Sequence, residues 1–278
     1  MAERLLVIAD QLPYPPRNGA TLPLCHYLAQ LSRTHELRLA LLLDAEQRID
    51  AEACAENERR FGPLLLGRCT RRGLLARVAD ELSGRGMFQH GWVATDTRAF
   101  DELAAPDAGW CTAPVLVSPI SALARWRALR AALSRWQPRR TVVAVHDCTA
   151  AEYRWRWRAP QPGALGRAKA WSHWLRAPLV ARAEARLLAE VDTVLVQTEA
   201  DRAAMRQLVG ADTAARTPLG ASCVRPDLFD LDASPGVAAQ VLFVAELSGE
   251  YAPIAAWLCR SVWPGVRAAH PAATLTIV

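Results

Sequence analysis

Two features are missing from this sequence: a cysteine framework and a long apolar run. The seven cysteines, at positions 25, 54, 69, 111, 148, 223 and 259, include no Cys-x-x-Cys pair. An odd, scattered set is typical of reduced thiols in the cytosol and argues against both a disulfide framework and a zinc site. No apolar run approaches the roughly 18 residues of a membrane-spanning helix, and the start, MAERLLVIAD, lacks the pattern of a signal peptide. We therefore expect a cytoplasmic protein.

Common catalytic motifs are missing as well. The sequence contains no Gly-x-Ser-x-Gly nucleophile elbow and no His-Glu-x-x-His helix. SGRGMFQ, residues 83–89, lacks the third glycine and the preceding strand of a dinucleotide-binding loop. DLD, residues 230–232, imitates a metal-binding Asp-x-Asp pair but lies in a linker-like stretch. We expect no metal ion and no bound cofactor.

Short apolar runs separated by helical patterns dominate what is present, and 51% of the residues are apolar. The strand-like runs are RLLVIA (4–9), ELRLALLL (36–43), TVVAVH (141–146), DTVLVQ (192–197), QVLFVA (240–245) and ATLTIV (273–278). Helical spacing is found in residues 24–31, 121–136 and 177–190. Strands that are apolar throughout are buried on both faces, and their alternation with helices predicts a doubly wound α/β fold with a parallel sheet.

A change of composition in residues 226–240, PDLFDLDASPGVAAQ, predicts a domain boundary. We expect a first domain over residues 1–235 and a second over residues 236–278. The second contains one strand, one helix (252–270) and one strand, which is too little to cover both faces of two apolar strands. Either the chain is cut short or a partner completes the domain, and we favour the first explanation.

The first predicted strand runs directly into a proline-rich loop, DQLPYPPRNGATLP, residues 10–23. In open α/β sheets, ligands lie outside the carboxyl ends of the strands, and the first strand–helix turn commonly approaches a phosphate. Asn18 and Gly19 add little bulk, so their backbone N–H groups are candidates to face a nucleotide diphosphate or a sugar, with a helix dipole behind them. The alternative is that the Asn-Gly pair only forms a turn between two elements.

Two ionisable residues, His146 and Asp147, follow an apolar strand. A histidine at a strand end is placed to contact a transferred sugar or its phosphate and to stabilise charge in the transition state. The alternative is a structural pair in which Asp147 caps a turn.

Two downstream residues are interpreted first as structural. Glu184 is expected on a solvated face, paired with Arg182 or Arg186, with support of an acceptor site as the alternative. Thr198 is expected to cap the N-terminus of the next helix.

Residues 153–178, YRWRWRAPQPGALGRAKAWSHWLRAP, interleave basic and aromatic side chains and contain no acid. The candidates for a membrane interface are Arg154, Trp155, Arg156, Trp157 and Arg158. Tryptophan suits the headgroup depth of a bilayer and arginine its phosphates, and the net charge of +5 favours acidic partners. One alternative is a helix with core tryptophans and arginines that extend to solvent. A single-stranded nucleic-acid surface is a further alternative that we do not expect.

The order of these motifs resembles that of the family 4 glycosyltransferases, which have two Rossmann-like domains facing across a cleft. The segments that carry the resemblance are PYPPRNGATLPLCHYLAQLSRTHELRLALL (13–42), VVAVHD (142–147), ARAEARLLAEVDTVLVQTEADRAAM (181–205), TPLGASCVRPDLF (217–229) and VLFVAELSGEYAPIAAWLCRSVWPGVRAAHPAATLTIV (241–278). The likeness extends over nearly all of the chain, is weakest over residues 60–120, and is particularly close to a branch involved in exopolysaccharide assembly.

The resemblance implies transfer of a sugar from a nucleotide-sugar, with retention, to a polysaccharide or lipid-linked acceptor at the inner face of the membrane. It implies that the first domain holds the acceptor and that His146 is catalytic. It also makes Asn18, Gly19, Asp147 and Gly220 candidates for contacts with substrate or donor. The alternative function is a noncatalytic subunit that binds acceptor and membrane and receives its donor half from a second polypeptide.

The sequence departs from the family pattern at several positions. Pro23 stands where the family usually has an arginine, Leu219 precedes Gly220 in place of an asparagine, and Ala245 occupies the position of a glycine. The family's basic phosphate-binding residues and paired glutamates are absent from these 278 residues. These departures put donor binding in doubt, and we expect little transfer activity from this chain alone.

Overall fold

The computed structural model describes residues 3–71, 73, 75, 92–96, 98–101, 109–132, 136–158, 163–210, 216–220, 239–245 and 251–278. The chain divides into two compact units, Met1–Val224 and Arg225–Val278, and each is considered by itself. The predicted domain boundary between residues 235 and 236 lies outside the described residues, as do SGRGMFQ (83–89) and DLD (230–232).

The first unit is built on a seven-stranded sheet with the order β4-β3-β2-β1-β5-β6-β7. The strands are β1 (Glu3–Ala9), β2 (His35–Asp44), β3 (Leu64–Arg71), β4 (Trp92–Asp96), β5 (Val115–Ser118), β6 (Thr141–Val145) and β7 (Thr193–Val196). Every neighbouring pair is parallel except β3 and β4, so β4 is an antiparallel edge strand. Without β4, the order is that of the doubly wound Rossmann fold, which confirms the predicted fold class.

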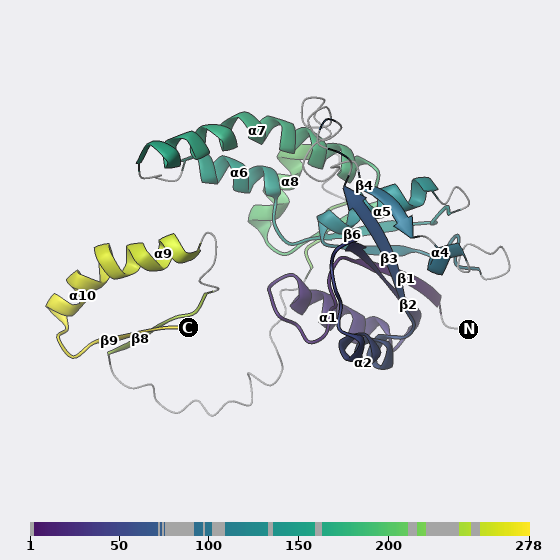
Figure 1. Ribbon diagram of the computed structural model, residues 1–278, viewed down its shortest axis with the longest axis horizontal. Coiled ribbons are helices and arrows are strands. Elements are labelled where there is room, and N and C mark those ends of the chain that lie inside the picture. The colour runs from purple at the N-terminus through teal and green to yellow at the C-terminus, as the bar shows by residue number, and fades with distance from the viewer. Residues whose placement is uncertain are drawn as a thin grey trace. The chain divides into compact units, whose positions relative to one another are not determined.

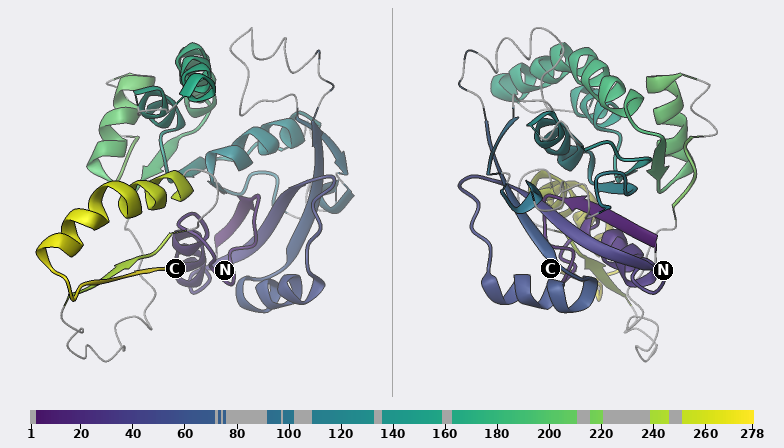
Figure 2. Two further views of the ribbon diagram at one scale, coloured as in Figure 1. Left: turned by 60° about the vertical axis from the view of Figure 1, so that its left-hand side comes forward. Right: turned by 90° about the vertical axis from the view of Figure 1, so that its right-hand side faces the viewer.

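Helices connect the strands and cover both faces of the sheet. They are α1 (Thr21–Leu31), α2 (Ala51–Phe61), α4 (Arg98–Asp101), α5 (Ile120–Ala132), α6 (Thr149–Arg158), α7 (Gly163–Ala189) and α8 (Glu199–Val209). Helices α1 and α2 lie on one face, and α5 lies on the other (Figure 1). Figure 2 shows the same layers from two further sides.

Side chains alternate between two cores along β1. Leu6 and Ile8 join the core formed with α5, α6 and α7, whereas Leu5, Val7 and Ala9 join the core formed with α1 and α2. Successive side chains of a strand point to opposite faces of a sheet. A strand covered on both faces is therefore apolar at every position, which is why the apolar runs predicted these strands correctly.

Three strands of the first unit were not predicted. β4 lies in a stretch to which the sequence analysis assigned no element, and β5 contains only four residues. β3 begins with three leucines but continues with Gly67 and Arg68. Gly67 is required by packing, because a Cβ there would lie 2.9 Å from the ring of Phe100.

The predicted helices also differ from the structure at their ends. The helix predicted over residues 177–190 is only the second half of α7, which begins at Gly163 and continues through Pro178. The helix predicted over residues 121–136 is described as far as Ala132, and Trp136 lies beyond it in the core. The prediction for Thr198 is confirmed, because its side chain accepts a hydrogen bond from the backbone N–H of Asp201 at the start of α8.

The second unit has the predicted strand–helix–strand order. It contains β8 (Gln240–Phe243), α9 (Tyr251–Trp257), the π-helical turn η4 (Leu258–Val262), α10 (Trp263–Ala269) and β9 (Thr274–Ile277). β8 and β9 pair in parallel, and the π turn interrupts the helix predicted over residues 252–270. Within this unit Val241 and Leu242 are exposed, in contrast to the buried strands of the first unit.

Candidate functional site

The carboxyl ends of the six parallel strands lie along one edge of the first unit's sheet. From β1 the chain proceeds to β2 and β3 in one direction, whereas from β5 it proceeds to β6 and β7 in the other. The loops after β1 and β5 therefore diverge, and the crevice at such a switch point is the usual ligand site of open α/β sheets. Five polar residues from these strand ends, here named the edge cluster, are Asp10, Ser118, Ser121, His146 and Gln197.

His146 follows β6 directly and is held through both ring nitrogens. Nε2 lies 3.1 Å from Ser118 Oγ, and Nδ1 lies 2.8 Å from Gln197 Nε2. Because an amide nitrogen only donates, the bond from Gln197 leaves the ring proton on Nε2, where it is shared with Ser118. Burial lowers the pKa of His146 below its ordinary value, although the charges of Asp147 and Asp10 oppose this shift. The structure thus places a neutral, oriented imidazole at the strand end where the sequence predicted a functional histidine.

Asp10, which the sequence interpretation did not single out, follows β1 at the same edge. Its Oδ2 accepts a hydrogen bond from Ser121 Oγ at 2.6 Å, whereas the buried Oδ1 has no partner among the described residues. Burial raises the pKa of Asp10, although the bond from Ser121 and the charge of Arg125 oppose the rise. Buried polar atoms without partners are costly, so they are concentrated at functional sites. The available sequence signal was the position of Asp10 as the first residue after an apolar strand.

Asn18, in the loop after β1, caps the N-terminus of α1. Its Oδ1 accepts from the backbone N–H groups of Ala20 at 3.0 Å and Thr21 at 2.8 Å, and its Nδ2 donates to Gln11 Oε1 at 3.0 Å. These bonds match the turn alternative, and a contact between Asn18 and a donor stays a prediction. Gly19 differs, because a Cβ there would meet no atom within 4 Å. The backbone of Gly19 therefore borders open space.

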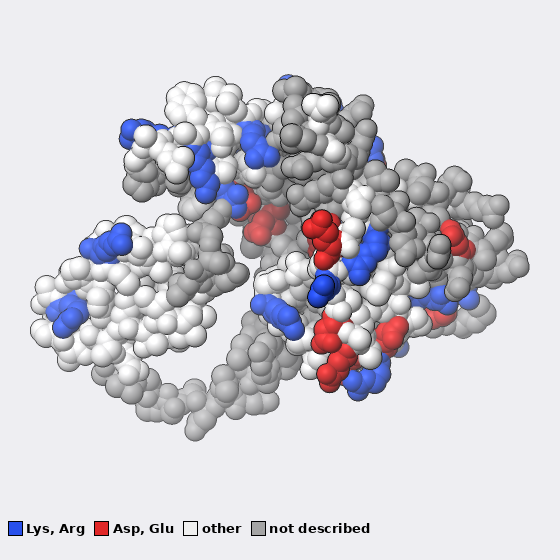
Figure 3. Space-filling view, viewed as in Figure 1, with Lys and Arg blue, Asp and Glu red and all other residues white. Residues whose placement is uncertain are grey.

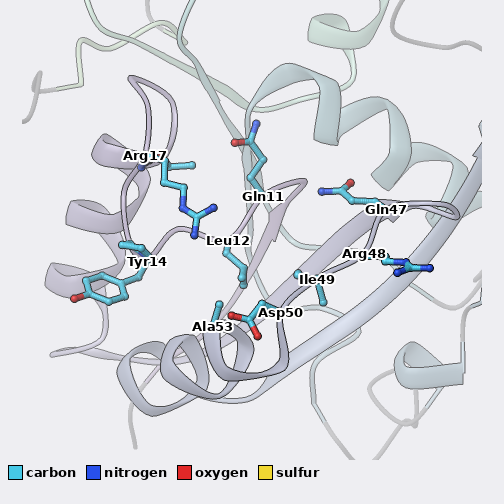
Figure 4. Close-up of a pocket in the computed structure, with 11 residues that line it drawn as sticks. Gln11, Leu12, Tyr14, Arg17, Gln47, Arg48, Ile49, Asp50 and Ala53 are labelled. Carbon is cyan, nitrogen blue, oxygen red and sulfur yellow. Dashed lines mark hydrogen bonds between the residues drawn. The ribbon is translucent and has the colours of Figure 1, made fainter. Parts of the chain in front are cut away.

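A pocket of about 240 Å³ lies between the loop after β1 and the loop after β2 (Figure 4). Figure 4 shows Arg17 and Gln47 reaching toward its middle from opposite sides. Neither Arg17 nor Arg48, which also lines the pocket, forms an ion pair with a described residue. The carboxylate of Asp50 is engaged in capping α2, where it accepts from the N–H of Glu52. Guanidinium groups without a carboxylate partner favour a ligand that carries a phosphate or a carboxylate.

A smaller hollow of about 10 Å³ lies beside this pocket. It is lined by Asp10 and Ser118 of the edge cluster, and it shares the lining residues Gln11 and Thr21 with the pocket. Pocket and edge cluster are therefore neighbours along the carboxyl edge of the sheet.

Two further predicted residues are Asp147 and Gly220. Asp147 lies shortly after β6, and Gly220 pairs with the end of β7. Asp147 is exposed. The N–H of Gly220 donates to Val196 O at 2.7 Å, and a Cβ at this position would lie 2.6 Å from the hydroxyl of Tyr27 and 2.9 Å from Cγ of Leu195. Close packing therefore explains the glycine, and ligand contacts of both residues stay predictions.

The interpretation of Glu184 as part of a solvated face is wrong. Its side chain is fully buried, with Oε1 accepting from the N–H of Thr149 at 3.1 Å and Oε2 from the N–H of Ala150 at 2.9 Å. A carboxylate from α7 thus caps the N-terminus of α6. Burial raises the pKa of Glu184 to about 7, although these N–H groups oppose the rise. Because α6 begins shortly after His146, Glu184 supports the backbone that carries the edge cluster.

The predicted membrane-interface residues lie on α6, and most of them are exposed. The exposed ones are Arg154, Trp155, Trp157 and Arg158. The core alternative is therefore wrong for both tryptophans. Arg156 is partly buried and donates to Glu152 Oε1 at 2.6 Å, so it is held within the helix by an ion pair.

A search of the described residues finds no group of three or more His, Cys, Asp or Glu side chains able to hold a metal ion. The expectation that no metal takes part stays a prediction. Across the same residues, no helix combines the length and the hydropathy needed to cross a membrane.

Comparison with known proteins identifies structural neighbours. No protein-family model matches the sequence, and no curated protein matches it. UGT2 of Phytolacca americana, solved with UDP-2fluoro-glucose and pterostilbene, is 12% identical with a TM-score of 0.42 over 89% of this chain and 60% of that chain. Its apo structure is 13% identical with a TM-score of 0.42 over 88% and 57% of the two chains. A UDP-glucosyltransferase of Polygonum tinctorium, capable of glucosylating indoxyl and solved with 3,4-dichloroaniline, is 11% identical with a TM-score of 0.42 over 88% and 59%. This chain thus spans less than two thirds of the length of these proteins.

Proposed function

We propose that this protein is a glycosyltransferase that moves a sugar from a nucleotide-sugar to a polysaccharide or lipid-linked acceptor at the inner face of a membrane. The observation that carries the proposal is the edge cluster, in which Asp10 has a buried carboxylate oxygen without a partner among the described residues and His146 has an oriented imidazole. Asp10 follows β1 at the switch point of a doubly wound sheet, where such proteins bind ligands, and His146 follows β6 and contacts Ser118 at the end of β5 beside that point. The order of the sequence motifs supports the same function.

The pocket next to the edge cluster is the proposed acceptor site. Arg17 offers its guanidinium group to an acceptor phosphate or carboxylate, and Gln11 and Gln47 offer amides to hydroxyl groups. Asp10 lines the hollow beside this pocket, so an acceptor bound in the pocket lies close to the edge cluster.

The donor diphosphate is proposed to lie before the N-terminus of α1, next to the uncovered backbone of Gly19. Asp147 and Gly220, at the ends of β6 and β7, are candidates for contacts with the donor. The proposed function takes the remaining donor contacts from a donor-side domain in cis, whereas a donor-side domain supplied in trans belongs to the alternative of a noncatalytic subunit.

In the reaction, a bond forms between an acceptor oxygen and the anomeric carbon, and the bond from that carbon to the diphosphate breaks. Asp10 Oδ1 accepts the hydrogen bond of the acceptor hydroxyl, and the raised pKa of Asp10 makes its carboxylate a better proton acceptor. The Nε2–H of His146 turns from Ser118 to an oxygen of the sugar or phosphate and stabilises its negative charge. Binding energy aligns donor and acceptor.

The test measures sugar transfer from radiolabelled nucleotide-sugars to a membrane extract, together with release of nucleoside diphosphate, by the full-length protein with its donor-side domain. Asp10→Asn keeps the shape and removes the charge, and His146→Ala removes the imidazole. Each is expected to lower the rate by about 100-fold or more, the size of a typical acid–base or charge-stabilising contribution. His35→Ala is the matched control, because His35 starts β2 at the opposite edge of the sheet, and its rate should be unchanged.

Two outcomes would contradict the proposal. Binding of a nucleoside diphosphate that does not depend on an attached sugar, without transfer, would identify an unrelated nucleotide-binding protein. Binding of acceptor without donor turnover, with activity restored only by a second polypeptide, would identify the noncatalytic subunit.

A further inference from the structure

Helices α6 and α7 lie side by side as a hairpin (Figures 1 and 2), and this hairpin collects exposed apolar side chains. Eight large apolar residues of the first unit are exposed in the described part of the chain, and six of them are on the hairpin. The six are Trp155, Trp157, Leu165, Trp171, Trp174 and Leu175, which together are named the hairpin surface. Because so much apolar area is concentrated on one pair of helices, it marks an interaction site.

The tryptophans of the hairpin surface form a connected group. The ring centroids of Trp157 and Trp174 are 6.4 Å apart, and those of Trp171 and Trp174 are 5.4 Å apart. Trp171, Trp174 and Leu175 are three and four residues apart, so they share one face of α7. The helices are held together beneath them by the buried side chains of Tyr153 and His173, whose rings meet edge to face at 5.2 Å.

A groove of about 410 Å³ runs between the two helices on this surface. Its floor is made of small or rigid residues of α7, Ala177, Pro178 and Ala181, and the rings of Trp157 and Trp174 also line it. The guanidinium-bearing residues Arg154 and Arg158 line it from α6. An apolar floor with two cations beside it fits a ligand with an anionic head and an apolar chain.

The charge of the hairpin also favours an anionic ligand. The basic residues described on it between positions 153 and 176 are Arg154, Arg156, Arg158, Arg167, Lys169 and Arg176, and the sequence has no acid in that interval. Among the described residues, no carboxylate forms an ion pair with Arg158, Arg167 or Lys169. Figure 3 shows basic side chains on the hairpin interspersed with uncharged ones.

We propose that the hairpin surface docks on an anionic lipid bilayer and that the groove holds one anionic lipid. The headgroup phosphate lies between Arg154 and Arg158, the acyl chain lies on the floor at Pro178, and the surrounding tryptophans lie at headgroup depth. The positive charges of Arg158, Arg167 and Lys169, which form no ion pair with a described carboxylate, match the negative surface of such a bilayer. This inference deepens the proposed function and rests on it for the reason why the protein docks on a membrane. Docking itself requires no sugar donor, so it can be tested separately.

The test is sedimentation of the full chain with phosphatidylcholine vesicles that contain either no or about one third phosphatidylglycerol. We expect binding to the anionic vesicles only, weakened by added salt. The double variant R154Q/R158Q should bind about 25-fold more weakly, at about fivefold per charge. W171S/W174S should lose about tenfold or more, because apolar area no longer enters the interface.

Matched controls separate this effect from general changes in charge or aromatic content. Trp257→Ser removes a ring that is 59% exposed, against 60% for Trp171, from the second unit and should leave binding unchanged. Arg267→Gln in α10 is the equivalent control for charge. Soluble glycerol 3-phosphate, which has the head but not the chains, should not displace the protein from vesicles.

Several results would overturn the inference. These are equal binding to neutral and anionic vesicles, equal losses in the control variants, or displacement by glycerol 3-phosphate alone. Tighter binding of single-stranded nucleic acid than of vesicles would assign the surface to that partner. Concentration-dependent dimers abolished by W171S/W174S would assign it to a second copy of the chain. If the unmodified protein binds vesicles but transfers no sugar, the proposed function is contradicted and the docking surface stands.

Discussion

The two halves of α7 differ in a way that composition does not predict. The second half, residues 177–189, buries Ala177, Val180, Ala183, Glu184, Leu187 and Leu188, whereas in residues 163–176 only His173 is buried. The half that contains a carboxylate is inside the protein, and the half with two tryptophans is outside. The reason lies in the neighbours, since the second half packs on the core of the sheet and the first half packs on α6. Burial of a helix is therefore decided by what lies opposite it.

The largest expected difference between the two halves of α7 is in how much a truncated leucine lowers the free energy of unfolding. Leu187→Ala in the buried half should lower the free energy of unfolding by about 2–5 kcal/mol, because it removes apolar contacts and leaves a cavity. Leu175→Ala, in the half where leucine is 60% exposed, is the matched control and should change it by about 0.5 kcal/mol or less. Chemical denaturation measures both. Similar losses in the two variants would mean that the halves do not differ in packing.

The pH dependence of stability provides the next test. Burial raises the pKa of Glu184 to about 7 from an ordinary value of 4.5, so the folded state binds this proton more tightly than the unfolded state. The contribution of Glu184 to stability is therefore complete below pH 4.5 and is lost as the pH rises through 7, by about 3 kcal/mol in total. Glu184→Gln should remove this part of the slope in denaturation curves measured from pH 5 to 8. An unchanged slope in the variant would contradict a buried, protonatable Glu184.

The hydrogen bonds of Glu184 allow a smaller test. Glu184→Ala leaves the N–H groups of Thr149 and Ala150 without an acceptor and should lower the free energy of unfolding by about 2 kcal/mol at pH 7. Glu190→Ala, directly after α7 and exposed, removes only a surface ion pair with Arg127 and should cost about 0.5 kcal/mol. Thermal unfolding of the two variants distinguishes a capping carboxylate from a surface one.

The smallest effect is expected in the exposed half. Trp171→Ser should change the free energy of unfolding by about 0.5 kcal/mol or less, because a large part of the ring already faces solvent. The measurement is denaturant unfolding followed by circular dichroism. A loss of several kcal/mol would show that the tryptophan is a packing residue, as in the core alternative.

The strands that could be predicted are those whose burial produces a recognisable run of apolar residues. β1, β2, β6 and β7 are apolar runs because both of their faces are covered, and such runs are recognisable without any neighbour. β3 was not recognised because Gly67 interrupts its run. This glycine is explained by side chains from other elements, since a Cβ there would lie 2.8 Å from Leu42 and 2.9 Å from the ring of Phe100. β5 was missed although β7, which is equally short, was predicted. β5 lies directly between Pro114 and Pro119, and prolines beside a short apolar run argue against a strand.

The candidate site was predicted in part, for a related reason. His146 was identified because a histidine that ends an apolar strand is visible in the sequence. Asp10 was not, since its importance comes from a carboxylate oxygen that is buried and unpartnered, with Ser121 on the other oxygen 111 positions away. Glu184 was misinterpreted because nearby arginines suggested ion pairs, whereas its partners are backbone N–H groups of another helix.

The sequence by itself determined that this chain forms a doubly wound parallel sheet and that polar residues follow its strands. Apolar periodicity and strand ends are properties of neighbouring residues, so they can be recognised in a single amino-acid sequence. Only the tertiary structure decided which polar residues meet at the carboxyl edge, that Glu184 is buried, and that the tryptophans of the hairpin are exposed. Each of these features depends on which distant segment of the chain packs against a residue. The residues next to it in the sequence do not reveal that segment.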